Sequence, residues 1–191
     1  MFKSFTMHSL NGVILAGGHS SRMGTDKALL SLDGETLLER AKHLLFECGA
    51  TKVTVCRNDG NPAHINDQFK DSGPLGGIHA ALTEDSSLPT LVIPVDLPLM
   101  HSSELSRLID EGFTHQRTSH FDNLYIPIFI WNPETLLEGL TQRLEEGKGL
   151  SLKRFFAERE ECSIPCKEDQ SLLNANTPEE WQEILERFQT L

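Results

Sequence analysis

The chain has 191 residues, of which 38% are hydrophobic and 24% are charged, as in a soluble domain that buries its own core. The formal net charge of −11 argues against a protein that binds nucleic acid or anionic membranes. No apolar run is long enough to span a membrane, and the four cysteines contain no CxxC pair. We expect one cytoplasmic domain over 1–191 with a flexible segment over 1–11, and we favour reduced thiols over a metal or redox pair at Cys162 and Cys166.

The first half of the chain alternates strand and helix patterns. An almost wholly apolar run over 12–16 stops at two glycines, which is typical of a strand buried on both faces of a parallel sheet. A short extended piece over 29–32 is followed by a turn at Asp33-Gly34. The remaining predictions are a helix over 36–48, a strand over 52–56, a helix over 74–83, a strand over 90–95 and a helix over 102–111.

The second half is less regular. A strand is predicted over 125–131, and Asn132-Pro133 then forms a good start for a helix to about residue 146. The pattern predicts a short helix over 151–157 and a last helix that opens on a capping box, Thr177 to Glu180. This alternation predicts a three-layer α/β/α sandwich, Rossmann-like, with a mostly parallel sheet. Ligands in such sheets bind beyond the carboxyl ends of the strands, where Gly17 and Asp96 are expected.

The segment over 15–27, LAGGHSSRMGTDK, combines the groups that a triphosphate needs. Its glycines allow close approach of the backbone, its serines add hydroxyls, and Arg22 and Lys27 add positive charge. The segment is neither a Walker A loop nor a GxGxxG motif. On composition alone, a glycine-rich surface loop explains it about as well as a phosphate site does.

This segment resembles the signature of the molybdenum cofactor guanylyltransferase family, the MobA-like nucleotidyltransferases. Three further segments resemble family motifs in the same order, and the resemblance covers about 12–185; the segments are GPLGGI at 73–78, PVDLP at 94–98 and NANTPEE at 174–180. It implies the fold of the nucleotide-diphospho-sugar transferases. It also implies transfer of GMP from GTP to the molybdenum-molybdopterin cofactor, with Mg²⁺ as the metal and pyrophosphate as the leaving group. The second glycine of LAGG and the closing segment favour guanylyl over cytidylyl transfer, because cytidylyl relatives commonly carry LAAG.

The resemblance also implies roles for individual residues. Arg22, Lys27 and Asp96 would be catalytic, and Asp96 would hold Mg²⁺ with Asn176 as a second candidate ligand. Asp96 could instead cap the helix that follows, and Asp67 could be a solvated loop acid. The implied nucleotide-binding residues are Leu15, Ala16, Gly17, Gly18, Ser21, Lys27, Asp67, Gly73 and Asp96.

Two positions depart from the family pattern. Cys56 stands where the family often has an asparagine that contacts the nucleotide, and Asn58 follows two residues later. On the acceptor side Pro127 is retained, but the histidine that often precedes it is not. The candidate residues for the acceptor are Asn174, Lys153 and Arg154, although a solvated basic turn explains the last two equally well.

Other functions remain open from the sequence. A cytidylyltransferase of the same cofactor, a sugar-phosphate nucleotidyltransferase and a non-catalytic NTP-binding protein are the alternatives, whereas a dinucleotide-binding oxidoreductase is disfavoured because GxGxxG is missing. We expect transient contacts with enzymes that make or receive the cofactor.

Overall fold

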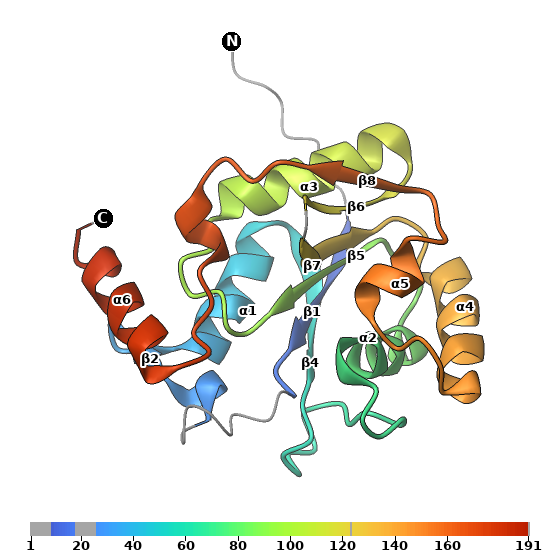
Figure 1. Cartoon of the computed structure of the whole chain (residues 1–191), viewed down its shortest axis with the longest axis horizontal. Coiled ribbons are helices and arrows are strands. Elements are labelled where there is room, and N and C mark those ends of the chain that lie inside the picture. Colours follow the sequence, from blue (N-terminus) through green and yellow to red (C-terminus); the bar gives the residue numbers. More distant parts are fainter. Residues whose placement is uncertain (1–8, 18–25, 123, 191) are drawn as a thin grey trace.

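A six-stranded sheet forms the centre of the molecule in a computed structural model that describes residues 9–17, 26–122 and 124–190 (Figure 1). Its strand order is β4-β1-β5-β7-β6-β8. Only β7 runs against the others, because β1 pairs in parallel with β4 and β5, β8 pairs in parallel with β6, and β7 is antiparallel to both its neighbours. The strands are β1 Leu10–Leu15, β4 Ala50–Cys56, β5 Thr90–Pro94, β6 Thr118–Phe121, β7 Leu124–Ile130 and β8 Glu161–Ile164.

Helices cover both faces of this sheet (Figure 1). Side chains alternate along β5, so that Leu91 and Ile93 enter one hydrophobic cluster and Val92 enters the other. The first cluster includes residues of α1 Leu37–Glu47, α3 Ser102–His115 and α6 Pro178–Phe188. The second includes residues of α2 Gly73–Glu84, α4 Pro133–Glu146 and α5 Leu152–Phe156. The predicted three-layer sandwich with a mostly parallel sheet is confirmed.

Local sequence signals set several of the element ends. Thr36 and Thr177 each form a capping box at the start of a helix, and Asn132 accepts a hydrogen bond from the Thr135 backbone N–H at the start of α4. Asp33 and Gly34 take positive φ values of 55° and 79°. Their turn joins β2 Ser31–Leu32 to β3 Glu35–Thr36 in a small hairpin.

Several expectations need correction. The segment predicted as extended over 29–32 contains the end of a 3-10 helix, η1 Lys27–Leu29, before β2 begins. Strands β6 and β8 were not predicted, because they are short and partly polar, and because β8 pairs with β6, which is distant in the sequence. Residues 10 and 11 of the expected flexible start belong to β1, and 1–8 lie outside the described residues.

Two further features concern cysteines and membranes. All four cysteines are free thiols. The helices in the described part of the chain include none that is long and apolar enough to cross a membrane.

A second 3-10 helix, η2 Asp169–Leu172, precedes the segment that leads to α6.

Candidate functional site

A cavity of about 1110 Å³ lies at the carboxyl ends of the three parallel strands β4, β1 and β5. Its wall includes the residues directly after each of these strands and the start of α2. This is the edge at which open α/β sheets bind ligands, and the cavity is as large as the larger pockets for small molecules. We call it the cleft. It is lined by 15–17 after β1, 26–28 at η1, 56–59 after β4, 94–96 after β5, Asp67, 69–74, Gly77 and Ile126.

Lys27, Asp96 and Asn176 meet at the β5 end of the cleft. The Lys27 ammonium donates to Asp96 Oδ2 at 3.2 Å and to Asn176 Oδ1 at 2.6 Å. The Lys27 and Asp96 side chains are mostly buried, at 18% and 22% exposure. The three groups together place a cation, a carboxylate and an amide where a ligand phosphate could approach.

The closing segment of the chain is held at this point by the backbone and by a helix cap. The Ala175 N–H donates to the Asp96 carbonyl oxygen at 3.0 Å. The Asn176 N–H donates at 2.7 Å to Glu180, which also accepts from the Thr177 N–H at 3.1 Å as part of the capping box. The cap of α6 therefore positions Asn176 against Lys27.

Asp67 and Cys56 lie toward the β4 side of the cleft. The Asp67 N–H donates to Asn58 Oδ1 at 2.8 Å. Burial raises the pKa of the Asp67 carboxyl, and its hydrogen bonding with Asn58 opposes that shift. The Cys56 thiol donates to the Gly77 carbonyl at 3.2 Å, and burial, with the nearby charge of Asp67, raises its pKa to about 12. Burial and the raised pKa keep the Cys56 thiol protonated, which indicates a packing role.

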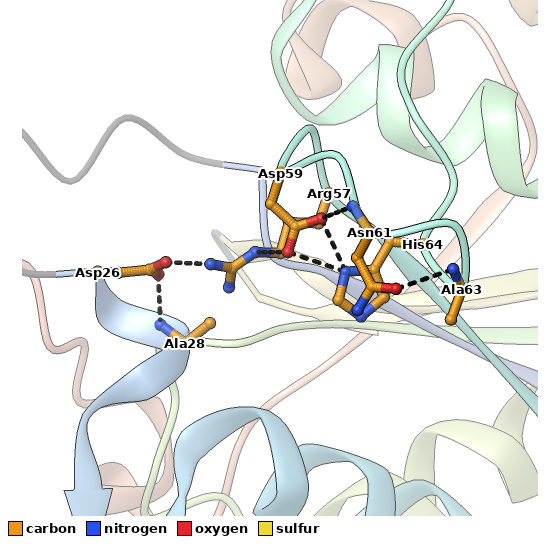
Figure 2. A network of polar contacts seen from close by, with 7 residues as sticks. All are labelled: Asp26, Ala28, Arg57, Asp59, Asn61, Ala63 and His64. Carbon is orange, nitrogen blue, oxygen red and sulfur yellow. Dashed lines mark hydrogen bonds and ion pairs between the residues drawn. The ribbon is translucent and has the colours of Figure 1, made fainter.

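Arg57 connects two loops at the same side of the cleft (Figure 2). Its Nη2 pairs with Asp26 Oδ2, and its Nε donates to Asp59 Oδ2 at 2.8 Å. Asp26 also caps η1 by accepting from the Ala28 N–H at 3.1 Å. Consecutive residues thus contact different strand ends, because Asp26 pairs with Arg57 after β4 while Lys27 pairs with Asp96 after β5.

The comparisons with known proteins decide the family. Residues 12–162 match the MobA-like NTP transferase domain. The chain belongs to this family. A molybdenum cofactor guanylyltransferase of Xanthomonas euvesicatoria pv. vesicatoria (strain 85-10) is 34% identical in an alignment of 178 positions that covers 91% of this chain and 93% of that protein. A probable molybdenum cofactor guanylyltransferase of Opitutus terrae (strain DSM 11246 / JCM 15787 / PB90-1) is 32% identical over 90% of this chain and 93% of its own length.

A solved structure supports the fold of the MobA-like chain. The molybdopterin-guanine dinucleotide biosynthesis protein A of Archaeoglobus fulgidus superposes with a TM-score of 0.78 at 20% identity, covering 95% of this chain and all of the other. The predicted family and the predicted enzyme class, a nucleotidyltransferase, are both confirmed.

The structure of the MobA-like chain brings most of the predicted site residues to one cleft. Asn176 joins them through Lys27. Asp71, which could be mistaken for Asp67, also lines the cleft and has a φ of 57°. Three predicted residues, Gly18, Ser21 and Arg22, lie outside the described residues. The predicted residues that line the cleft are Leu15, Ala16, Gly17, Lys27, Asp67, Gly73 and Asp96.

The residues predicted to bind the acceptor do not line the cleft. Asn174 donates weakly to the Leu172 carbonyl at 3.4 Å, and it is not part of the cleft lining. Lys153 and Arg154 are exposed on α5 and are not part of that lining either. Their role stays a prediction.

Sequence reasoning missed the link between Asp26 and Arg57. Asp26 directly precedes the motif lysine and Arg57 directly follows a predicted strand, but these positions do not indicate an ion pair between residues 31 positions apart.

Proposed function

We propose that this chain transfers GMP from GTP to the molybdenum-molybdopterin cofactor, releasing pyrophosphate and forming the guanine dinucleotide cofactor. The observation that carries the proposal is the convergence of Lys27, Asp96 and Asn176 at one end of the cleft. The family motifs that contain these residues begin at positions 15, 94 and 174. Relatives called molybdenum cofactor guanylyltransferases match about nine-tenths of the chain, which supports the choice of substrates.

In the proposed reaction an oxygen of the acceptor's phosphate attacks the α-phosphorus of GTP. A new P–O bond forms, the bond from the α-phosphorus to the oxygen that bridges it to the β-phosphorus breaks, and pyrophosphate leaves with that oxygen. The attacking oxygen is already ionised, so positioning and neutralisation of charge supply the rate enhancement. We assign Lys27 to the negative charge that develops on the triphosphate, and Arg22 to the same task.

Asp96 is the residue that we expect to hold Mg²⁺. The described residues contain no group of three His, Cys, Asp or Glu side chains placed to hold a metal ion. Mg²⁺ needs only one or two protein carboxylates, because water and substrate phosphates complete its shell. The Asp96 carboxylate fits that requirement, and the Asn176 amide oxygen is a second donor 2.6 Å from the Lys27 ammonium. When bound, the ion would neutralise charge on the phosphates.

Release of pyrophosphate with Mg²⁺ and isolated molybdenum cofactor tests the proposal, with GTP, CTP and ATP compared in parallel. We expect release with GTP alone. Release with CTP in place of GTP would make the chain a cytidylyltransferase, and no release from folded protein would overturn nucleotidyl transfer to this acceptor.

Two variants test the residues. Lys27→Met and Asp96→Asn should each lower kcat/KM by about 10²–10³-fold, because each removes a charge at the reacting phosphates. The matched control is Lys52→Met, which breaks a Lys–Asp pair of 3.4 Å with Asp85 away from the cleft. It should change kcat/KM by less than about twofold, since exposed pairs contribute little. Near-normal turnover in folded Lys27→Met would refute the assignment.

A further inference from the structure

Arg57 lines the cleft and carries a hydrogen-bond donor that has no partner among the described residues. Its side chain is only 10% exposed and lines the cavity. Two of its three guanidinium nitrogens contact the carboxylates of Asp26 and Asp59. The third, Nη1, is buried and has no hydrogen-bond partner in the part of the chain that the structure describes. It points away from both carboxylates (Figure 2). A buried N–H without a partner is costly, so a ligand atom that accepts a hydrogen bond would be favoured there.

The charges around Arg57 indicate what kind of acceptor fits. One guanidinium cation faces two carboxylates, so a phosphate would meet net negative charge. Asp59 keeps its negative charge, because the hydrogen bond from the Asn61 N–H lowers the pKa of its carboxyl and His64 and Arg57 lower it further. A neutral carbonyl oxygen can accept from Nη1 without this repulsion. The nucleotide offers such an oxygen only on its base.

The strand order indicates where the base lies. Lys27 and Asp96, the groups suited to the phosphates, are at the end of β5, and Arg57 and Asn58 follow β4 on the other side of β1. A nucleotide whose phosphates contact Lys27 and which extends across the end of β1 would bring its base to the end of β4. This step rests on the proposed function.

We propose that Arg57 is a specificity-determining residue that donates from Nη1 to O6 of guanine. Guanine presents an acceptor at this position, whereas adenine presents an amino donor, which would face the Nη1 donor and leave both unpaired. A site built to hydrogen-bond a substrate group rejects analogues that lack it. Arg57 thereby selects 6-oxopurine over 6-aminopurine nucleotides.

Equilibrium binding by calorimetry with Mg²⁺, in the absence of acceptor, tests this inference separately from the transfer reaction. The probes are GTP, ITP, ATP and 2-aminopurine riboside triphosphate, which keeps the 2-amino group of GTP but lacks O6. The wild-type protein should bind GTP about 10- to 100-fold more tightly than the 2-aminopurine analogue. ITP, which keeps O6, should bind more tightly than ATP by a similar factor.

The Arg57→Met variant should reduce the GTP-to-analogue ratio to within about threefold, because the donor is gone. Any general loosening of the two loops affects both ligands and cancels in the ratio. The control Arg117→Met removes an exposed arginine that pairs with Glu160, and it should keep the wild-type ratio. If Arg57→Met does not fold, Arg57→Lys replaces it, because a lysine ammonium held between the two carboxylates also leaves no Nη1 donor.

A wild-type ratio that persists in the Arg57 variants overturns the inference, and so does a wild-type protein that binds GTP and the analogue equally. Failure of folded wild-type protein to bind any of the four nucleotides overturns the proposed function, and this inference with it. Binding of GTP without transfer overturns only the choice of acceptor.

Discussion

Replacing Asn176 with alanine removes the 2.6 Å hydrogen bond that its side chain accepts from the Lys27 ammonium. Hydrogen bonds to charged groups contribute about 1.5–3 kcal/mol. The Lys27 side chain is 18% exposed, so water replaces part of this interaction and a loss of about 1–2 kcal/mol remains. If Asn176 acts by positioning Lys27, kcat/KM for GMP transfer should fall by about 5- to 30-fold.

A double-mutant cycle measures whether the two side chains act as a pair. The same Asn176→Ala change is made in Lys27→Met, and radiolabelled GTP allows kcat/KM to be measured in the slow variants. In the Lys27→Met protein we expect Asn176→Ala to lower kcat/KM by less than about twofold, which gives a coupling energy of about 1–2 kcal/mol between the two side chains. If Asn176→Ala lowers kcat/KM by the same factor with and without Lys27, the two residues act independently and the reasoning is refuted.

Three further predictions concern stability. Gly112→Ala should lower the free energy of unfolding by about 1–3 kcal/mol in denaturant titrations, because the added Cβ would overlap the buried Phe129 ring; unchanged stability would contradict this packing. Thr177→Ala should cost about 1 kcal/mol and also lower transfer activity, because the cap of α6 holds Asn176; normal activity would separate the cap from the site. The pKa of Cys56 is about 12 in the folded protein, against an ordinary 9.0. Above pH 9 the thiol ionises in the unfolded chain but not in the folded one, so the free energy of unfolding is unaffected below pH 9 and falls by about 4 kcal/mol as the pH rises to 12. Urea titrations at several pH values should show a shallower alkaline decline in Cys56→Ala, and an equally steep one would count against the shift.

The sheet could be predicted where its signals are local. Strands β1 and β5 are rich in Val, Ile or Leu because helices cover both faces, and β4 is rich in Val and Thr. Each capping box, at Thr36 and at Thr177, is formed by residues three positions apart in the sequence. Strands β6 and β8 could not be predicted, because both are short and partly polar, and because Cys162 of β8 pairs with Ser119 of β6 across 43 positions. Tertiary context decides such short segments.

The site residues also divide into those that local motifs predict and those that depend on the tertiary fold. The sequence predicts Gly17 and Asp96 at strand ends and Lys27 in the motif that follows the first strand, and all three line the cleft. The contact of Lys27 with Asn176 was not predicted, although Asn176 was a candidate, because it depends on how the last segment returns across the sheet. Arg57 was not predicted as a site residue, because its ion pair with Asp26 depends on how the fold brings two loops together.

The contact between Lys27 and Asn176 joins residues 149 positions apart, which has a consequence for how the protein is made. The strands β4, β1 and β5 that carry the cleft are complete by residue 94, when a ribosome has yet to add the segment that contains Asn176. Closing so long a loop is entropically unfavourable and follows contacts that are closer in sequence. We therefore expect a newly synthesised chain to form its cleft first and to reach its full transfer activity only in the last step of folding.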